Sequence, residues 1–253
     1  MCKRQRICAV LVALAAGNTM SASVIARPRT AFRHLYALHQ NGRVTIQNLY
    51  GNVSITAWDR DAVLVEAIKH SADPRRLEDA RIVVEPTADS LSIRTQYAGS
   101  DADHPTSVEY RITVPRGIHL ESVVLTNGQL WLSGLSGRVK ASAVNGDIRA
   151  LKLGGQVELS TVNGRVEADF DRTSPANPIS LSSVNGPINL TIPPGSGASL
   201  EARNLSGGIA SDLGRVARTE AGHRLIVKGN GPQIHLHNVN GGISIRSTER
   251  SCT

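Results

Sequence analysis

The chain has 253 residues, a length that fits one or two domains, and its 28 Lys and Arg outnumber its 21 Asp and Glu to give a net charge of +7. Aromatic residues make up 3% of the sequence, and the charges are dispersed along it. A nucleic-acid-binding protein normally has a basic stripe interleaved with aromatic residues, so the composition argues against that class.

Residues 1–26 have the organisation of an export signal. A basic segment with three Lys or Arg residues precedes a short apolar run at 7–16, and small residues follow it. We expect cleavage after Ala26, with Ala22 as the alternative site. The apolar run is too short to cross a bilayer, so a retained anchor is the weaker alternative. The mature protein would then be periplasmic, secreted or at the cell surface.

Cysteine usage adds little about function. Cys2 and Cys8 leave with the leader, and Cys252 lies in the tail at 248–253. A lone thiol in an oxidising compartment could cross-link two chains, but we prefer to interpret it as part of a flexible tail.

Residues 27–120 are expected to form a β-rich cap region. Two strands are predicted at 43–46 and 53–55, each after a glycine. Longer alternating stretches then suggest a meander, interrupted by one short helix at 74–79 and a polar loop at 99–107. We expect this region to be continuous with the repeats that follow, and a separate domain is the alternative.

Residues 121–247 contain a nine-residue repeat. An apolar residue stands two positions after each repeating glycine, which predicts short strands separated by turns. Glycine and asparagine tolerate the positive φ angles of such turns. The glycines interpreted as corner residues are Gly128, Gly137, Gly146, Gly155, Gly164 and Gly186.

Asn-Gly pairs fall at every second corner, which predicts an all-β fold of the single-stranded parallel β-helix type, a β-solenoid with two strands per 18-residue coil. In this register Lys140 lies above Glu158, and Arg149 lies above Glu167. One face would carry Leu130, Ile148, Val166, Ile188, Ile209 and Ile234, and the other Val139, Val157, Ile179, Leu200, Leu225 and Ile243.

All variation in repeat length falls on one edge of this coil, in the insertions 171–178, 193–199 and 211–222. Insertions in solenoids often gather on the binding face. Three arginines in these insertions, together with the histidine directly after the last insertion, form a candidate binding edge for an anionic ligand. The four residues are Arg172, Arg215, Arg218 and His223. Loops that drifted in length without functional consequence are the alternative.

No catalytic, cofactor or metal site is predicted. His235 and His237 share one outward strand face but lack a third metal ligand. Asp169 and Asp171 are a carboxylate pair of the kind used in glycoside hydrolysis, although acids at strand ends are commonplace. The serines have no partnered histidine at a recognisable spacing. We therefore expect a protein that is not an enzyme.

Three segments resemble the bacterial putative-adhesin family of exported β-strand-repeat domains, of the toast-rack or autotransporter-adhesin-head type. They are Asn-Gly-x-Val-x-Ile at 41–46, Ala-Trp-Asp-Arg-Asp at 57–61 and Ile-Thr-Val-Pro-Arg-Gly at 112–117. The resemblance covers about residues 38–247 and implies a β-helix-like fold outside the cytoplasm, with no catalytic residues. This chain departs from the family in the long step from Ile209 to Leu225.

The sequence thus favours a non-enzymatic, exported interaction module whose partner is an envelope component, a glycan or a second copy of itself. Open β-sheet ends give a physical motive for self-association. The alternatives are a carbohydrate-active β-helix enzyme and an accessory factor in cell-envelope stress signalling.

Overall fold

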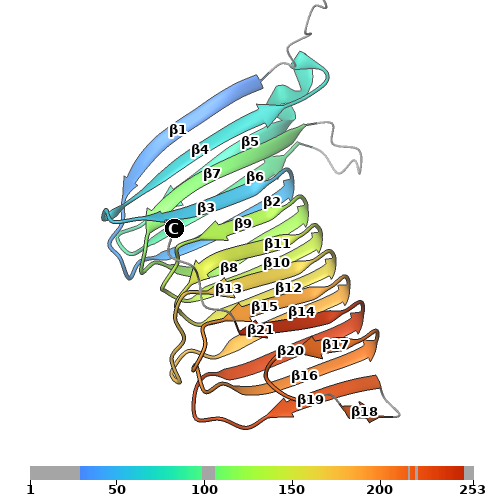
Figure 1. The fold of residues 1–253 in the computed structure, drawn as a ribbon. Coiled ribbons are helices and arrows are strands. Elements are labelled where there is room, and N and C mark those ends of the chain that lie inside the picture. The colour runs from blue at the N-terminus through green and yellow to red at the C-terminus, as the bar shows by residue number, and fades with distance from the viewer. Residues whose placement is uncertain (1–28, 99–105, 216, 220–221, 248–253) are drawn as a thin grey trace, which may run out of the picture.

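The computed structural model describes residues 29–98, 106–215, 217–219 and 222–247. The predicted leader with its cleavage sites, and the tail with Cys252, lie outside the described residues. The described part of the chain is all-β apart from one 3₁₀ helix, η1 (Pro74–Asp79), at the position predicted for a short helix. The strands form two mostly parallel sheets that face each other (Figure 1).

The sheets, here called sheet A and sheet B, have ten and eleven strands. Sheet A has the order β1 (Arg29–Ala37), β4 (Ala62–His70), β7 (Ser107–Pro115), β3 (Val53–Trp58), β9 (Leu130–Ser133), β11 (Ile148–Leu153), β13 (Val166–Phe170), β15 (Ile188–Ile192), β21 (Ile243–Ser247), β17 (Ile209–Ser211). Sheet B has the order β18 (Ala217–Thr219), β19 (Gly222–Val227), β16 (Ser199–Ser206), β20 (Gln233–Asn240), β14 (Ile179–Asn185), β12 (Val157–Asn163), β10 (Val139–Asn145), β8 (His119–Asn127), β2 (Arg43–Tyr50), β6 (Ser90–Tyr97), β5 (Ala80–Pro86).

The central repeats from β8 to β15 stack in the predicted register. Successive strands alternate between the sheets, and from β10 to β15 each pairs in parallel with the strand two before it. Val139 pairs with Val157. The two predicted pairs of outward charged residues are in contact, with Lys140 Nζ 3.0 Å from Glu158 Oε1 and Arg149 Nε 3.3 Å from Glu167 Oε2. This arrangement is that of a β-solenoid-like repeat.

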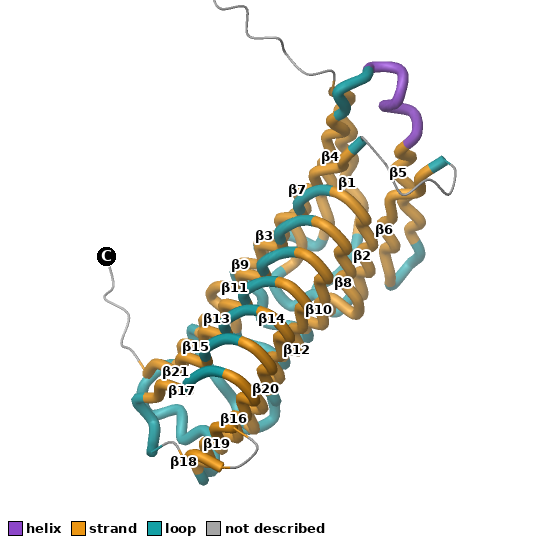
Figure 2. Tube along the Cα trace, turned by 90° about the vertical axis from the view of Figure 1, so that its right-hand side faces the viewer, coloured by secondary structure: helices purple, strands orange, loops and turns teal. Residues whose placement is uncertain are grey.

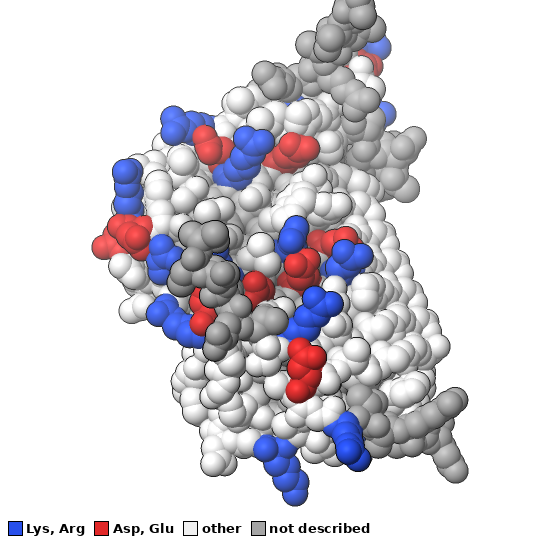
Figure 3. Space-filling model, viewed as in Figure 1, with Lys and Arg blue, Asp and Glu red and all other residues white. Residues whose placement is uncertain are grey.

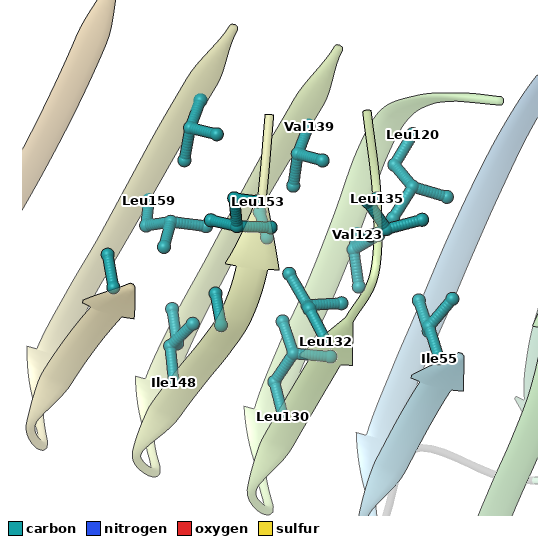
Figure 4. Packing of buried hydrophobic residues seen from close by; sticks show 14 of the residues in the cluster. Ile55, Leu120, Val123, Leu130, Leu132, Leu135, Val139, Ile148, Leu153 and Leu159 are labelled. Carbon is teal, nitrogen blue, oxygen red and sulfur yellow. The ribbon is translucent and has the colours of Figure 1, made fainter. Parts of the chain in front are cut away.

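The core lies between the two sheets and consists of the inward residues of each strand. Leu130 and Ile148 of sheet A face Val139 and Leu159 of sheet B (Figure 4). Burial of each such side chain contributes about 1.5–3 kcal/mol, because apolar surface leaves water. Buried alanines, such as Ala150, allow the sheets to approach closely.

The N-terminal strands do not form a simple meander. β4 pairs antiparallel with β7 in sheet A, and β5 pairs antiparallel with β6 in sheet B. β6 and β7 then pair in parallel with β2 and β3. The coil formed by β2 and β3 is therefore enclosed between β6–β7 on one side and β8–β9 on the other.

The C-terminal coil is also enclosed, and here the sequence prediction was wrong for Ile234 and Ile243. Ile234 lies in sheet B, between Ile179 and Leu200, and Ile243 lies in sheet A, between Ile188 and Ile209. The prediction assumed that every strand changes sheet. The long step after Ile209 instead contains an antiparallel hairpin, β18–β19, which stays in sheet B.

The position of that hairpin explains the enclosed coil. β19 pairs antiparallel with β16 and covers its outer edge. Because that edge is occupied, β20 enters on the inner edge of β16, beside β14. The order of the last coils in space therefore differs from their order in the sequence.

Tight two-residue corners form one long edge of the stack, and Figure 2 looks onto this edge. Each corner joins a strand of sheet B to the next strand of sheet A and begins with glycine. The glycines are Gly51, Gly128, Gly146, Gly164, Gly186, Gly207 and Gly241. Gly137 and Gly155 lie on the opposite edge, which also holds the longer loops.

Crowding, rather than positive φ, explains most of the glycines singled out in the sequence. Gly128 and Gly186 have positive φ, but Gly137, Gly146, Gly155 and Gly164 do not. A Cβ on Gly146 would overlap the carbonyl oxygen of Gly128 in the neighbouring coil. The backbones of successive coils approach too closely for a side chain.

Candidate functional site

An asparagine ladder runs along the corner edge. In five coils the strand of sheet B ends in asparagine, and four of the five side-chain amides donate a hydrogen bond to the amide oxygen of the asparagine in the neighbouring coil. The N···O distances are 2.8–3.0 Å. The ladder consists of Asn127, Asn145, Asn163, Asn185 and Asn240. Such stacked amides stabilise parallel, in-register strands.

A second polar column lies inside, two residues before the ladder. Thr161 Oγ1 donates to the carbonyl oxygen of Gly146 at 3.0 Å, and Asn238 Nδ2 donates to that of Gly186 at 3.1 Å. These groups satisfy carbonyls that the corners would otherwise leave unpaired. The ladder and this column have structural roles, and they hold the neighbouring outward residues in fixed positions.

An aliphatic stripe follows the ladder on the outer face of sheet B. It occupies the outward position directly before the ladder residue, or before Tyr50 and Ser206, which stand in register with the ladder in β2 and β16. The coil of β8 is the exception, because its residue at this position is Thr126. The stripe consists of Leu49, Val144, Val162, Val184, Val239 and Leu205. Apart from Val239, which is half-buried, these side chains are 40–58% exposed.

The surroundings of the stripe are uncharged in the central coils. The next outward column contains Ser142, Ser160 and Ser182 in register. Sequence reasoning missed this surface, although the recurring Val-Asn-Gly triplet is its signal. The sequence analysis explained the glycine of this triplet and the inward apolar residues, but it gave no role to the exposed valine.

The outer face of sheet A, in contrast, is rich in charge. In Figure 3, acidic and basic side chains alternate over the middle of this face, while the corner flank at the right of the view is largely free of them. One outward column contains Trp131, Arg149, Glu167, Asn189 and Ser244 in register.

Two adjoining hollows lie along this column and share Glu167. The first, of about 140 Å³, is lined by Gln129, Trp131, Asp147, Ile148, Arg149, Arg165 and Glu167. The second, of about 200 Å³, is lined by Glu167, Asn189, Leu190, Thr191, Ser244 and Arg246. Both combine side chains of opposite charge with amides or hydroxyls.

The four residues of the predicted binding edge do not form one site. Arg172 is exposed on the loop between β13 and β14. Arg218 and His223 are cross-strand partners in the hairpin β18–β19, and Arg215 lies in the segment leading to it. In sheet B, β20 and β16 separate β14 from this hairpin. The third insertion thus extends the sheet instead of projecting beside the other loops.

The residues considered for catalysis or metal binding are also separated. His235 lies between Ser180 and Glu201, and His237 lies between Ser182 and Arg203. Within the described ranges, no three His, Cys, Asp or Glu side chains gather in a way that could hold a metal ion.

Three ion pairs fix segments on either side of the central repeats β8–β15. Arg116 Nε donates to Asp59 Oδ1 at 3.0 Å, which lowers the pKa of that carboxyl group through hydrogen bonding and charge attraction. The Trp-Asp and Pro-Arg motifs of the family resemblance therefore meet in space. Glu201 Oε1 accepts hydrogen bonds from Arg203 and Arg224, and these lower the pKa of Glu201.

None of the helical structure in the described part of the chain is long and apolar enough to cross a membrane.

No family model and no curated protein matches the sequence, but comparison with solved structures gives several matches. A putative cell adhesion protein from Clostridium sporogenes matches with a TM-score of 0.52 and 12% identity, over 87% of this chain and 100% of that chain. A putative adhesin from Bacteroides fragilis matches with a TM-score of 0.40 and 12% identity, over 86% and 97% of the two chains. A putative adhesin from Parabacteroides merdae gives 0.38 and 12%, over 85% and 96%. The match to the Clostridium sporogenes protein confirms the predicted resemblance to adhesin-like proteins at the level of the fold.

Proposed function

We propose that this protein is an exported, non-enzymatic, adhesin-like interaction module, built as a single-stranded β-solenoid with two strands per coil and acting in the periplasm or at the cell surface. The observation that carries the proposal is the aliphatic stripe on sheet B. A row of exposed valines and leucines in an ordered sheet face costs solubility unless it is covered, and such patches mark interaction sites.

The occupant of the stripe is a second copy of this chain. A row of similar side chains repeating at the strand spacing of about 4.8 Å is complementary to itself, because the valines of one copy fit between those of the other. The uncharged serine and asparagine columns beside the stripe add no charge repulsion between copies. A two-fold axis would place the same residues on both sides.

The area of this face sets the strength of the expected dimer. Seven coils span about 30 Å, and the serine, valine and asparagine columns together are about 13 Å wide, so each partner covers roughly 400 Å². Standard interfaces bury about 800 Å² on each partner. We therefore expect a dimer that dissociates in the micromolar range.

Analytical ultracentrifugation over a concentration series tests the proposal. The mature chain should pass from monomer to dimer, and Val162→Glu should weaken the dimer at least about tenfold, because it places a charge in the centre of an apolar contact. Thr56→Glu, which adds the same charge to the exposed outer side of β3, is the control and should leave the dimer unchanged. A wild-type chain that stays monomeric at millimolar concentration would refute the self-association.

A further inference from the structure

We infer that the outer face of sheet A binds a carboxylated saccharide, with Trp131 as the stacking surface and Arg165 as the group that receives the carboxylate. The inference rests on the proposed function of an interaction module and adds the chemical class of a ligand. It uses the opposite sheet from the aliphatic stripe, so the two surfaces can be tested independently.

The two tryptophans of the chain differ in how they are used. Trp58 donates its indole N–H to the carbonyl oxygen of Ala62 at 2.8 Å, and Arg60 lies over its ring at 5.2 Å. Trp131 projects outward from β9 and is 37% exposed. Within the described ranges it makes no hydrogen bond through its indole N–H and no ring contact. A flat apolar ring with an unused donor is suited to a ligand that is apolar on one face and rich in hydroxyl groups at its rim, as a pyranose ring is.

The polar groups around Trp131 match the edges of a sugar. Gln129 and Asp147 line the same hollow as the tryptophan ring, and Asn189 and Thr191 line the next one. Amide and carboxylate groups can each form two hydrogen bonds with neighbouring hydroxyls, and a few such polar groups around an apolar surface determine the orientation of a ligand.

The charges of the two hollows favour an anionic sugar. Arg149 pairs with Glu167, and Asp147 Oδ1 accepts the backbone N–H of Arg165 at 2.7 Å. The guanidinium groups of Arg165 and Arg246 have no acidic partner among the described residues. Three arginines therefore face two carboxylates across the hollows. One carboxylate from the ligand balances this excess, and guanidinium groups bind carboxylates through paired hydrogen bonds.

The length of the site points to an oligosaccharide. From Trp131 on β9 to Asn189 on β15, the outward column crosses three strand spacings, about 14 Å. The two hollows follow one another along this line and share Glu167. A linear chain lying across the strands would contact both hollows, whereas one ring would fill only the first.

Isothermal titration calorimetry with three acidic probes, oligogalacturonate, alginate oligomers and sialyllactose, tests the inference, with a neutral maltooligosaccharide for comparison. We expect at least one acidic probe to bind, with an affinity that falls as salt rises, and the neutral probe to bind at least tenfold more weakly. Trp131→Ala and Arg165→Gln should each lower the affinity about tenfold or more, and Trp131→Phe should restore most of it. Thermal melting of each variant separates loss of binding from loss of fold.

The control variants are Arg60→Gln, which removes a cation next to the other tryptophan, and Val162→Glu, which lies on sheet B. Both should bind the acidic probe as the wild type does. Failure of all three acidic probes, equal binding of the neutral probe, or unchanged affinity in folded Trp131→Ala would overturn the inference. A chain that dimerises but binds none of the probes refutes the saccharide site alone. A monomeric chain that binds them refutes only the self-association.

Discussion

At the scale of single residues, the chain is shaped by what lies directly beside each backbone group in the neighbouring coil. The corner glycines show this most clearly. Gly146 is needed because the carbonyl of Gly128 occupies the place that a Cβ would take. Gly208 has the same residue type and also lies in a corner, but at the second corner position, where other coils carry side chains such as that of Asp147 and where no atom lies within 4 Å of an added Cβ.

This contrast predicts opposite outcomes for two alanine substitutions. Gly146→Ala should lower the free energy of unfolding by about 2 kcal/mol or more, because two backbones must separate to accept the methyl group. Gly208→Ala should change it by less than about 0.5 kcal/mol, as expected for an open surface position. Urea unfolding of the two variants measures both values. Equal stability of the two variants would show that the coils do not constrain Gly146 as described.

At the scale of elements, the strand register was predictable from the sequence and the order of the coils was not. Alternating side chains and repeating Asn-Gly corners establish the pairing of Val139 with Val157, because a one-residue slip would move every apolar side chain to the surface. The antiparallel pairing of β19 has no such signal. Leu225 fits a parallel or an antiparallel strand equally well, since both bury alternate residues.

The candidate sites, too, were predictable only where they depend on the strand register and not on the order of the coils. Arg172 and His223 were grouped because their loops fall on one edge of an idealised coil, and the hairpin removes that edge for His223. The Trp131 hollow needed the structure, since it joins side chains from several strands. The 18-residue register did place Arg149 above Glu167, and both residues are part of that site.

The hairpin strand β19 should respond to pH through Glu201. Hydrogen bonds from Arg203 and Arg224 lower the pKa of this carboxyl group in the folded state. Its contribution to stability is therefore complete above the ordinary glutamate value of 4.5 and is lost as the pH falls through the lowered folded value. Amide protection of Leu225 and Ile226, corrected for intrinsic exchange, should decline over this range, and Glu201→Gln should remove most of that decline.

Val157 in the middle of the stack is the internal reference, and its protection should change less than that of β19. Equal pH dependence of β19 in the wild type and in Glu201→Gln would show that the contact between Glu201 and Arg224 does not hold the hairpin in place.

At the scale of the whole molecule, the stack is closed at both ends by coils that lie out of sequence order. A sequential solenoid should tolerate loss of its last coil, because each repeat contacts mainly its neighbours. Here the last coil, β20–β21, lies between β14–β15 and β16–β17. Its contacts therefore join β16–β17, an earlier part of the chain, to the rest of the stack.

Truncation after residue 228 should consequently unfold more than the segment removed. We expect amide protection to be lost throughout 199–227, because Leu200 and Ile209 lose their partners Ile234 and Ile243. A chain ending at residue 196 is the matched control and should keep its protected strands up to β15. Hydrogen exchange with mass spectrometry measures both, and persistent protection of β16 in the longer truncation would contradict the described order.

The enclosed coil also has a consequence for the timing of synthesis. β16 and β17 are made before the strands that will separate them from β14 and β15, so a growing chain cannot add its native layers strictly from first to last. The C-terminal end of the stack can therefore reach its final strand order only after β21 has left the ribosome. A nascent chain interrupted late would carry an unpaired β16 edge, which proteases and chaperones recognise as unfinished.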